Sequence, residues 1–319
     1  KYYSIKSSSL RGKKSVVKAV DDISFDVKIG ETFGIVGESG CGKSTMGKSV
    51  IRLIEPTEGK VILDGQDFTS LKGKELQEAR DKIKLIFQDP YASLNPRMTV
   101  QEIISEGLVI KGIKDKEYIQ QRVYEILELV GLVKEHATRY PHEFSGGQRQ
   151  RIGIARSVIM NPDMIIADEP TTALDVTIQA QILELLKDLQ KKQGCSIMLI
   201  THDLGVIAEM ADEVVVMYAG RVIEKGTARE IFHNPLHPYT IGLQKSKPLI
   251  TSNSNEPLYS IPGQVPNPIN LPNACYFKSR CSKCINKCNG EYPREIKVSD
   301  THSVSCYLYE ESEVGKDGE

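Results

Sequence analysis

The sequence has no tryptophan, few other aromatic residues and almost no net charge. Aromatic side chains make up 6% of the 319 residues, and 41 Lys and Arg oppose 42 Asp and Glu for a formal net charge of -1. This balance excludes a strongly basic protein that binds nucleic acid by charge alone, and it also excludes an acidic disordered chain. At roughly 100–200 residues per domain, the length predicts about two globular domains.

Long apolar runs are absent as well. Stretches such as Val214–Tyr218 fall far short of the ~18 residues that a membrane span requires. The sequence shows no signal-peptide pattern and does not begin with Met. We therefore expect any role at a membrane to depend on separate membrane subunits.

Cysteine is scarce over most of the chain and concentrated near its end. Cys41 and Cys195 stand alone, and five more cysteines crowd into residues 275–306. An odd number of clustered cysteines, in a long chain without a secretion signal, argues against a secreted disulfide framework. Composition alone leaves this cluster unexplained.

Short apolar runs that alternate with helical periodicity predict an α/β fold with a parallel sheet flanked by helices. Residues from about 99 to 160 are mostly helical by periodicity, and a Pro-rich stretch after His233 predicts an extended tail or linker. The expected strands are Thr32–Val36, Lys84–Phe87, Met164–Ala167, Ser196–Ile200 and Val214–Met217, with helices over Lys43–Ile54 and Ile178–Lys192 and a hairpin at Asp64-Gly65.

A glycine-rich motif lies where the first of these strands is expected to end. Residues 37–44 match the pattern G-x-x-x-x-G-K-[ST] between a strand and a helix, and Thr45 follows directly. Backbone N–H groups of such a loop point at phosphate oxygens, and the helix N-terminus adds a favourable dipole. Lys43 is expected to reach the β- and γ-phosphates, and the Ser44 hydroxyl to bind Mg²⁺. The predicted nucleotide-binding residues are Gly37, Ser39, Gly40, Cys41, Gly42, Lys43, Ser44 and Thr45.

Two carboxylates follow a second apolar strand. Asp168 and Glu169 come directly after Met164–Ala167. Asp168 can hold Mg²⁺, and Glu169 can polarise a water molecule for attack on the γ-phosphate. An Asp-Glu pair is also common as a solvated strand end, so this prediction depends on the glycine-rich loop in the same chain.

A second element that could bind phosphate lies about 100 residues after the first. It reads Phe-Ser-Gly-Gly-Gln over residues 144–148. Ser145 can cap a helix there, and the two glycines allow an anion to approach free N–H groups. Taken alone, the motif fits a simple capped helix start better than a phosphate site.

Together these motifs resemble those of the ATP-binding cassette (ABC) family, and the match spans nearly the whole chain. Ser145–Gln148 is similar to the ABC signature, with Phe144 where Leu is commoner. Gln88 resembles the Q-loop glutamine, Asp175 the D-loop aspartate and His202 the switch histidine. The resemblance implies a P-loop cassette with a RecA-like parallel-sheet core, an antiparallel β subdomain and a helical signature subdomain.

The resemblance also implies that two cassettes pack head to tail. Each ATP would lie between the glycine-rich loop of one subunit and the signature of the other. The signature residues Ser145, Gly146, Gly147 and Gln148 would then bind the γ-phosphate in trans. Asp175 would contact the opposite subunit.

The same resemblance implies the catalytic roles. Glu169 would be the general base, and His202 would contact the γ-phosphate and hold the water and the base in line. Gln88 would reach Mg²⁺ or water and report the nucleotide state to a membrane partner, while Asp168 and Ser44 complete the Mg²⁺ site. In this family an aromatic residue near the N-terminus usually stacks on adenine. Tyr3 is the first choice by position and Tyr2 the second, and an exposed aromatic at a chain end is an equal alternative.

Longer segments narrow the resemblance to the ATPases of oligopeptide and dipeptide (and nickel) importers. They are Phe87–Pro96, Arg139–Phe144, His237–Thr240 and Ile261–Gly263. The resemblance implies a peripheral subunit at the cytoplasmic face of the cell membrane, whose ATP hydrolysis powers import of dipeptides or oligopeptides. The implied partners are a second, homologous ATPase subunit, two transmembrane permease subunits and, indirectly, an extracytoplasmic peptide-binding protein, with no nucleic acid.

Two kinds of alternative stay open. Nickel chelates or oligosaccharides are other cargoes for the same machinery. A soluble ABC ATPase in DNA repair or translation is a different class, but such proteins tend to carry long coiled coils or two cassettes, and this sequence has neither. A P-loop kinase is disfavoured by the signature and by the Glu169 and His202 pair.

In the importer subfamily the C-terminal cysteines can hold a 4Fe-4S cluster. The matching residues are Cys275, Cys281, Cys288 and Cys306. Four thiolates suit a tetrahedral Zn²⁺ equally well, with Cys284 in a knuckle-like spacing and His302 as a spare ligand, and reduced structural thiols are the third interpretation. Nearby basic residues that could offset a cluster's charge are Lys278, Arg280, Lys283 and Lys287.

These patterns divide the chain into two parts. We expect a cassette over residues 1–240, which includes the helical signature subdomain at about 90–157. A Pro- and Cys-rich C-terminal extension is expected over residues 241–319.

Overall fold

The computed structural model describes residues 1–5, 15–246 and 259–313. Part of the Pro-rich stretch for which a tail was predicted, residues 247–258, therefore lies outside the described residues. No helix in the described part of the chain is long and apolar enough to cross a membrane.

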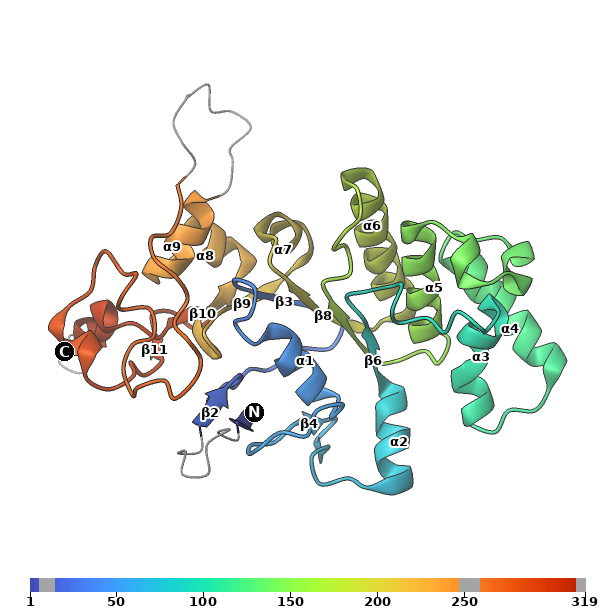
Figure 1. Cartoon of the computed structure of the whole chain (residues 1–319), viewed down its shortest axis with the longest axis horizontal. Helices are drawn as coiled ribbons and strands as arrows, with labels where there is room; N and C mark the ends of the chain where they lie inside the picture. Colours follow the sequence, from blue (N-terminus) through green and yellow to red (C-terminus); the bar gives the residue numbers. More distant parts are fainter. Residues whose placement is uncertain (6–14, 247–258, 314–319) are drawn as a thin grey trace.

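A mixed sheet of eight strands forms the centre of the molecule (Figure 1). Strands β3, β6, β7, β8 and β9 pair in parallel, and β10, β12 and β11 continue the sheet in antiparallel pairs. In spatial order the strands are β11 (Ile296–Lys297), β12 (Ser303–Val304), β10 (Arg221–Thr227), β9 (Glu213–Tyr218), β3 (Thr32–Val36), β8 (Ser196–Thr201), β7 (Met164–Asp168) and β6 (Ile83–Ile86). The parallel, helix-flanked sheet expected from the sequence is confirmed.

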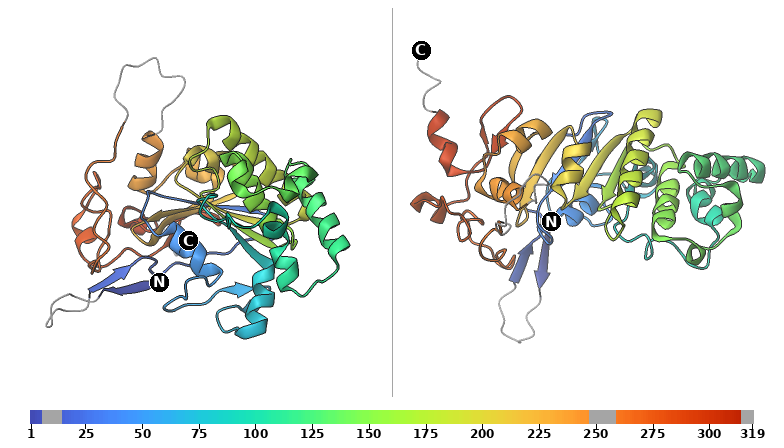
Figure 2. Two further views of the ribbon diagram at one scale, coloured as in Figure 1. Left: turned by 45° about the vertical axis from the view of Figure 1, so that its right-hand side comes forward. Right: turned by 90° about the horizontal axis from the view of Figure 1, so that it is seen from above.

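Helices cover both faces of this sheet and build a lobe at one end. Helices α6, α7 and α8 lie on one face and α1 on the other, while α3, α4 and α5 form the lobe, opposite the C-terminal strands (Figures 1 and 2). The helices are α1 (Lys43–Val50), α2 (Gly73–Lys82), α3 (Val100–Ile110), α4 (Lys116–Leu129), α5 (Gly146–Val158), α6 (Val176–Gln193), α7 (Leu204–Met210), α8 (Ala228–His233) and α9 (Pro238–Lys245).

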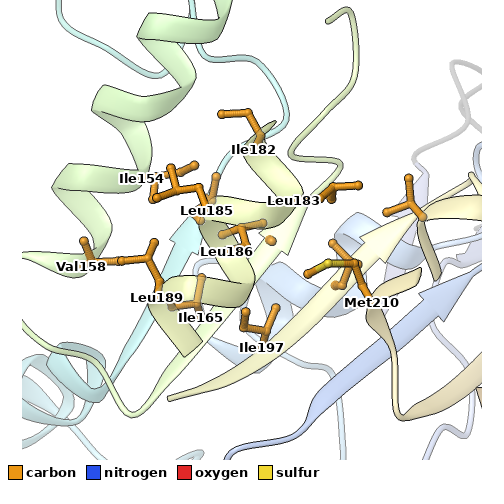
Figure 3. Close-up of a cluster of buried hydrophobic side chains, with 14 of the residues drawn as sticks. Ile154, Val158, Ile165, Ile182, Leu183, Leu185, Leu186, Leu189, Ile197 and Met210 are labelled. Atoms are coloured by element: carbon orange, nitrogen blue, oxygen red, sulfur yellow. The ribbon is translucent and has the colours of Figure 1, made fainter. Parts of the chain in front are cut away.

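Alternation along the central strands explains this layering. In β8, Ile197 and Leu199 belong to the apolar core under α6 and α7, whereas Met198 and Ile200 belong to the core under α1. Successive side chains of a strand point to opposite faces, so a strand that is apolar at every position must be covered on both sides. Figure 3 shows the first core, where the apolar face of α6 packs between β8 and helix α5.

Two small antiparallel pairs lie beside α1. Strand β1 (Tyr2–Ile5) pairs with β2 (Ser15–Lys18), and β4 (Ile62–Leu63) pairs with β5 (Gln66–Asp67). The second pair turns at Asp64 and Gly65, whose φ angles of 49° and 77° are those of the hairpin turn that Asp-Gly favours. The hairpin predicted at this dipeptide is therefore confirmed.

A substitution in α6 tests the first core. Leu186 is fully buried there, so Leu186→Ala should lower the free energy of unfolding by about 2–5 kcal/mol, because it leaves a cavity. Val176→Ala, at a side chain that is 83% exposed on the same helix, should change it by less than about 0.5 kcal/mol. Urea unfolding followed by circular dichroism measures both, and equal effects would contradict the assigned packing.

Candidate functional site

The glycine-rich loop runs from the end of β3 into the start of α1. Gly40 and Gly42 have φ angles of 81° and 103°, and a Cβ on Gly42 would lie 2.1 Å from the Ala19 carbonyl oxygen. The loop therefore needs glycine at position 42, both for its backbone conformation and for its close approach to a neighbouring segment. Lys43 is buried, and its Nζ donates to the carbonyl oxygens of Gly37 at 2.6 Å and Glu38 at 3.0 Å.

Cys41 belongs to this loop, but its side chain is buried. Its side chain is 1% exposed and belongs to the core that contains Met46 of α1. Burial raises the pKa of the Cys41 thiol, so the sulfur is a neutral, apolar filler. Only the backbone of Cys41 is thus available to a phosphate.

Ser44 and Asp168 meet between α1 and the end of β7. The Ser44 hydroxyl donates to Asp168 Oδ1 at 2.8 Å. Burial raises the pKa of Asp168, against the hydrogen bond from Ser44 and the nearby lysines, which lower it. A buried carboxylate whose charge is disfavoured by desolvation gains most from a cation beside it.

Glu169 is the centre of the cluster formed by the predicted catalytic residues. Gln88 Nε2 donates to its Oε2 at 2.9 Å, and His202 Nδ1 lies 3.2 Å from its Oε1. The Thr172 hydroxyl also donates to Oε2, at 2.8 Å. Thr172 was missed from the sequence, although its place three residues after Glu169 was available as a signal. The structure therefore brings Gln88, Glu169 and His202 together and adds one hydroxyl.

The backbone of Glu169 is itself unusual. Its φ is 48°, a left-handed value that a non-glycine residue adopts at a cost of about 1–3 kcal/mol. Its N–H donates to the Ile200 carbonyl at 2.8 Å, and its carbonyl accepts from Thr172 N–H at 3.1 Å. These bonds hold the strained residue and aim its side chain toward Gln88 and His202.

The predicted signature motif and the predicted D-loop aspartate lie beside each other at two helix starts. Ser145 caps α5 in a reciprocal capping box with Gln148, and Asp175 caps α6 by accepting from the Ile178 N–H at 3.0 Å. A Cβ on Gly147 would lie 2.5 Å from Ile178 Cγ2, which places α5 against α6. Within the described residues, no hydrogen bond joins Ser145 or Gln148 to the glycine-rich loop, so one chain does not bring the two phosphate-binding elements into contact.

The two N-terminal tyrosines have different surroundings. The Tyr2 hydroxyl donates to Asp21, and this hydrogen bond raises the pKa of Tyr2 to about 12. Tyr3 is 38% exposed, with Lys1 Nζ 5.1 Å from its ring centroid. Tyr2 is therefore engaged in the fold, and Tyr3 has the accessible ring.

The prediction of a 4Fe-4S cluster is wrong, as is the zinc alternative. In the described part of the chain, which includes every C-terminal cysteine, no three His, Cys, Asp or Glu side chains are arranged to hold a metal ion. Burial raises the pKa of Cys275 to about 12 and that of Cys306 to about 11, and Cys275 and Cys281 pack against the apolar core. As folded here, Cys275, Cys281, Cys288 and Cys306 are free thiols.

The other residues assigned to a metal site are also engaged elsewhere. His302, the spare zinc ligand, is buried with its Nε2 2.9 Å from Glu224 Oε1. Arg280 forms an ion pair with Glu38 and Lys287 one with Glu310, so neither offsets the charge of a cluster. Spacing and residue type were compatible with a metal, but within the described residues the fold does not assemble these side chains into a metal-binding group.

Comparison with known sequences covers both parts of the chain. Residues 20–172 match the family described as ABC transporter, and residues 223–288 match the one described as oligopeptide/dipeptide transporter, C-terminal region. The chain is 45% identical to the oligopeptide transport ATP-binding protein AppF of Bacillus subtilis, over 97% of this chain and 95% of that protein. It is 44% identical to the dipeptide transport ATP-binding protein DppF of Haemophilus influenzae, over 96% of this chain and 94% of that protein.

Solved structures of ABC cassettes are also similar to this chain. The dimeric post-hydrolysis form of the ATP-binding cassette MJ0796, bound to ADP and Pi, is 33% identical with a TM-score of 0.63 and covers 72% of this chain and 96% of that one. The structure of cbiO1 from Clostridium perfringens, part of an ABC transporter complex, is 30% identical with a TM-score of 0.62, over 72% of this chain and 88% of that one.

The fold, the nucleotide loop and these matches define the chain as an ABC-type ATPase. Because the full-length relatives and the C-terminal match extend beyond the cassette, the assignment can be narrower. The chain belongs to the ATP-binding proteins of the oligopeptide/dipeptide ABC transporter family.

Substitution of the two glycines of the predicted signature tests how α5 packs against α6. Gly147→Ala should lower the free energy of unfolding by about 1–3 kcal/mol, because the new Cβ overlaps Ile178. Gly146→Ala is the matched control, since its Cβ would meet only Leu174 Cδ2 at 3.6 Å, an ordinary contact. Thermal or urea unfolding of the nucleotide-free chain measures both, and a Gly147→Ala variant as stable as wild type would show that α5 and α6 do not pack as described.

Proposed function

We propose that this chain is one of two ATPase subunits that power the import of dipeptides or oligopeptides through separate membrane subunits. The observation that carries the proposal is the full-length similarity to the peptide transport ATP-binding proteins AppF and DppF, including the C-terminal region. The intact cluster around Glu169 supports hydrolysis by this subunit itself.

ATP is held by the glycine-rich loop. Backbone N–H groups of residues 39–45 and the ammonium group of Lys43 bind the phosphates once Lys43 exchanges its two carbonyl partners for phosphate oxygens. Tyr3, which has the accessible ring of the N-terminal pair, stacks on adenine.

The pair of Ser44 and Asp168 fits a magnesium ion, because a hydroxyl and a carboxylate oxygen 2.8 Å apart are the hard oxygen donors that Mg²⁺ prefers. Gln88 offers a third oxygen from the next strand. When bound, Mg²⁺ would neutralise charge on the β- and γ-phosphates.

Glu169 accepts the proton of the attacking water. Three neighbours hold its carboxylate, namely Gln88, Thr172 and His202, so it needs no reorganisation when the water arrives. His202 is half exposed, which leaves its ring able to reach the γ-phosphate as well.

The signature completes the site of a second subunit. Ser145 caps α5, and Gly146 and Gly147 form its first turn, where a helix N-terminus attracts phosphate. Asp175 lies beside them at the start of α6. Two chains packed head to tail would each contribute a glycine-rich loop to one site and a signature to the other.

The partners follow from the same assignment. They are a homologous ATPase subunit, two transmembrane permeases and, indirectly, a peptide-binding protein, and the chain associates peripherally with the membrane complex. We keep the division into a cassette over residues 1–240, with a signature subdomain at about 90–157, and an extension over 241–319 as part of this proposal.

Replacement of the base tests the catalytic assignment. Glu169→Gln keeps the size and shape of the side chain but removes the carboxylate that accepts a proton. ATP affinity should stay near that of wild type, while phosphate release should fall by about 10²–10⁴-fold. Glu209→Gln, which removes a surface carboxylate paired with Lys187, is the control and should hydrolyse ATP normally. Undiminished turnover in Glu169→Gln would remove the base role from this residue.

Purification of the tagged chain from membranes tests the transport assignment. We expect two permease subunits and a second ATPase to co-purify, and Glu169→Gln in cells to abolish dipeptide uptake without affecting uptake of a free amino acid. Recovery of ribosomes or DNA without any membrane subunit would overturn the transport function. Lost nickel uptake with normal peptide uptake would overturn the peptide cargo.

A further inference from the structure

Glu38, inside the glycine-rich loop, is contacted by two residues from the C-terminal part of the chain. Its backbone N–H donates to the Tyr239 hydroxyl at 2.9 Å. Its carboxylate accepts a bidentate pair of hydrogen bonds from Arg280, at 2.7 Å from Nη1 and 3.0 Å from Nη2. Tyr239 lies on α9, and Arg280 lies in the segment between α9 and β11. Neither residue belongs to the nucleotide motifs.

Arg280 is buried, and several hydrogen bonds and aromatic rings fix its side chain. It is 7% exposed, its Nε donates to the Pro262 carbonyl at 3.0 Å, and its Nη1 lies 3.4 Å from the Tyr218 hydroxyl. Its guanidinium also lies 5.8 Å from the Tyr218 ring centroid and 5.9 Å from that of Phe277. The ion pair with Glu38 raises the pKa of Arg280, so the guanidinium stays charged. A planar, partly buried, bidentate pair of this kind is both strong and geometrically specific.

Several of the chain's few aromatic residues gather at this junction. The ring centroids of Tyr218 and Tyr239 are 4.7 Å apart, and Phe277 lies 5.2 Å from Tyr218 and 5.5 Å from Tyr239. Tyr218 ends β9, Tyr239 is in α9 and Phe277 is in the extension. The cluster fixes the extension against the strand beside β3, so Arg280 reaches Glu38 from a rigid base.

A second route anchors the extension four residues before Arg280. The Tyr276 hydroxyl donates to Asp21 Oδ2 at 3.2 Å, and Arg221 Nε donates to the same oxygen at 2.9 Å. Asp21 N–H donates to the Gly220 carbonyl, and Gly220 N–H donates to the Cys41 carbonyl within the loop. The loop is thus reached from the extension at both its Glu38 end and its Cys41 end.

These contacts matter because a carboxylate within a phosphate loop can do harm. The loop's N–H groups and the N-terminus of α1 attract any anion, including the loop's own Glu38, and an unpaired charge there would also repel polyphosphate. Arg280 pairs with the carboxylate and so offsets its charge. Tyr239 fixes the Glu38 backbone, while Lys43 bonds to its carbonyl. The carboxylate and the backbone N–H of Glu38 therefore both have partners from outside the loop.

We propose that Arg280 and Tyr239 are positioning residues that hold Glu38 out of the phosphate site, so that the C-terminal region sets the affinity of the glycine-rich loop for nucleotide. The inference rests on the assignment of residues 37–45 as the ATP-binding loop. It adds to that assignment a dependence on residues far outside the nucleotide motifs.

The test compares ATP binding by Arg280→Met, Glu38→Gln and the double variant in the full-length chain. Arg280→Met should raise the Kd for ATP about tenfold, because it leaves a charged carboxylate beside the phosphates. The double variant should recover most of the lost affinity, since no unpaired charge remains. In the assembled transporter the KM for ATP should rise in Arg280→Met while kcat at saturating ATP stays within about twofold, because the Glu169 cluster is untouched.

Arg294→Met is the matched control. Its side chain is 66% exposed in the same extension, with Nε 4.0 Å from Glu310, and it should leave the Kd unchanged. Arg280→Lys, which keeps the charge but not the bidentate geometry, should lie between wild type and Arg280→Met. Tyr239→Phe should weaken ATP binding by about threefold, because it removes one neutral hydrogen bond.

Three outcomes distinguish this inference from the proposed function. A wild-type chain that binds no ATP would contradict the nucleotide site itself. Wild-type affinity in a folded Arg280→Met variant would overturn only the role of Arg280. A double variant no better than Arg280→Met would show that Arg280 acts through packing and not through the Glu38 charge. If Arg280→Met fails to fold, Arg280→Lys and Glu38→Gln decide the question by the same titration.

Discussion

Parallel pairing of β3, β8 and β7 is the constraint on which the nucleotide site depends. Val36 lies opposite Thr201, and Asp168 lies opposite Ile200, so the three strands end at one edge of the sheet. The residues that follow them include Gly37, Glu169 and His202, which are remote in sequence but share this edge. Ligands of open α/β sheets bind outside the carboxyl ends of the strands for this reason. An antiparallel neighbour at any of these positions would send one of the groups to the opposite edge.

Within that edge, burial and fixed hydrogen bonds prepare the charges. Burial raises the pKa of Asp168, and the Ser44 hydroxyl donates to one of its oxygens. Glu169 keeps a left-handed backbone because bonds to Ile200 and Thr172 hold it. Strain of this kind persists only where the surroundings over-determine the conformation. The cluster around Glu169 is therefore arranged within one chain, whereas the predicted signature at the start of α5 makes no hydrogen bond to the glycine-rich loop among the described residues.

The C-terminal region is part of the same body and not a separate appendage. Strand β12 pairs with β10 and so extends the central sheet, and the buried His302 and Glu224 join the two strands through their side chains. The Glu224 carboxylate also accepts from the N–H groups of Leu236 and His237, just before α9. These contacts fix the start of α9, which carries Tyr239. Tyr239 and Arg280 then contact Glu38 in the glycine-rich loop, although neither belongs to a nucleotide motif.

The sequence alone determined the class of fold and the strands of the core, and it predicted Gln88 and His202 as residues that act together with Glu169. Local motifs carry this information, since a loop of fixed spacing between a strand and a helix has few conformations. Thr172 escaped notice because a hydroxyl in a turn has no distinctive pattern. Only the tertiary structure decided what the C-terminal residues do. The family resemblance of the cysteine spacing implied a metal cluster, and Arg280 was predicted to offset the cluster's charge. In the structure Arg280 pairs with Glu38, and the cysteines are free thiols. Side-chain direction in an irregular segment depends on packing against remote strands, and no local pattern records it.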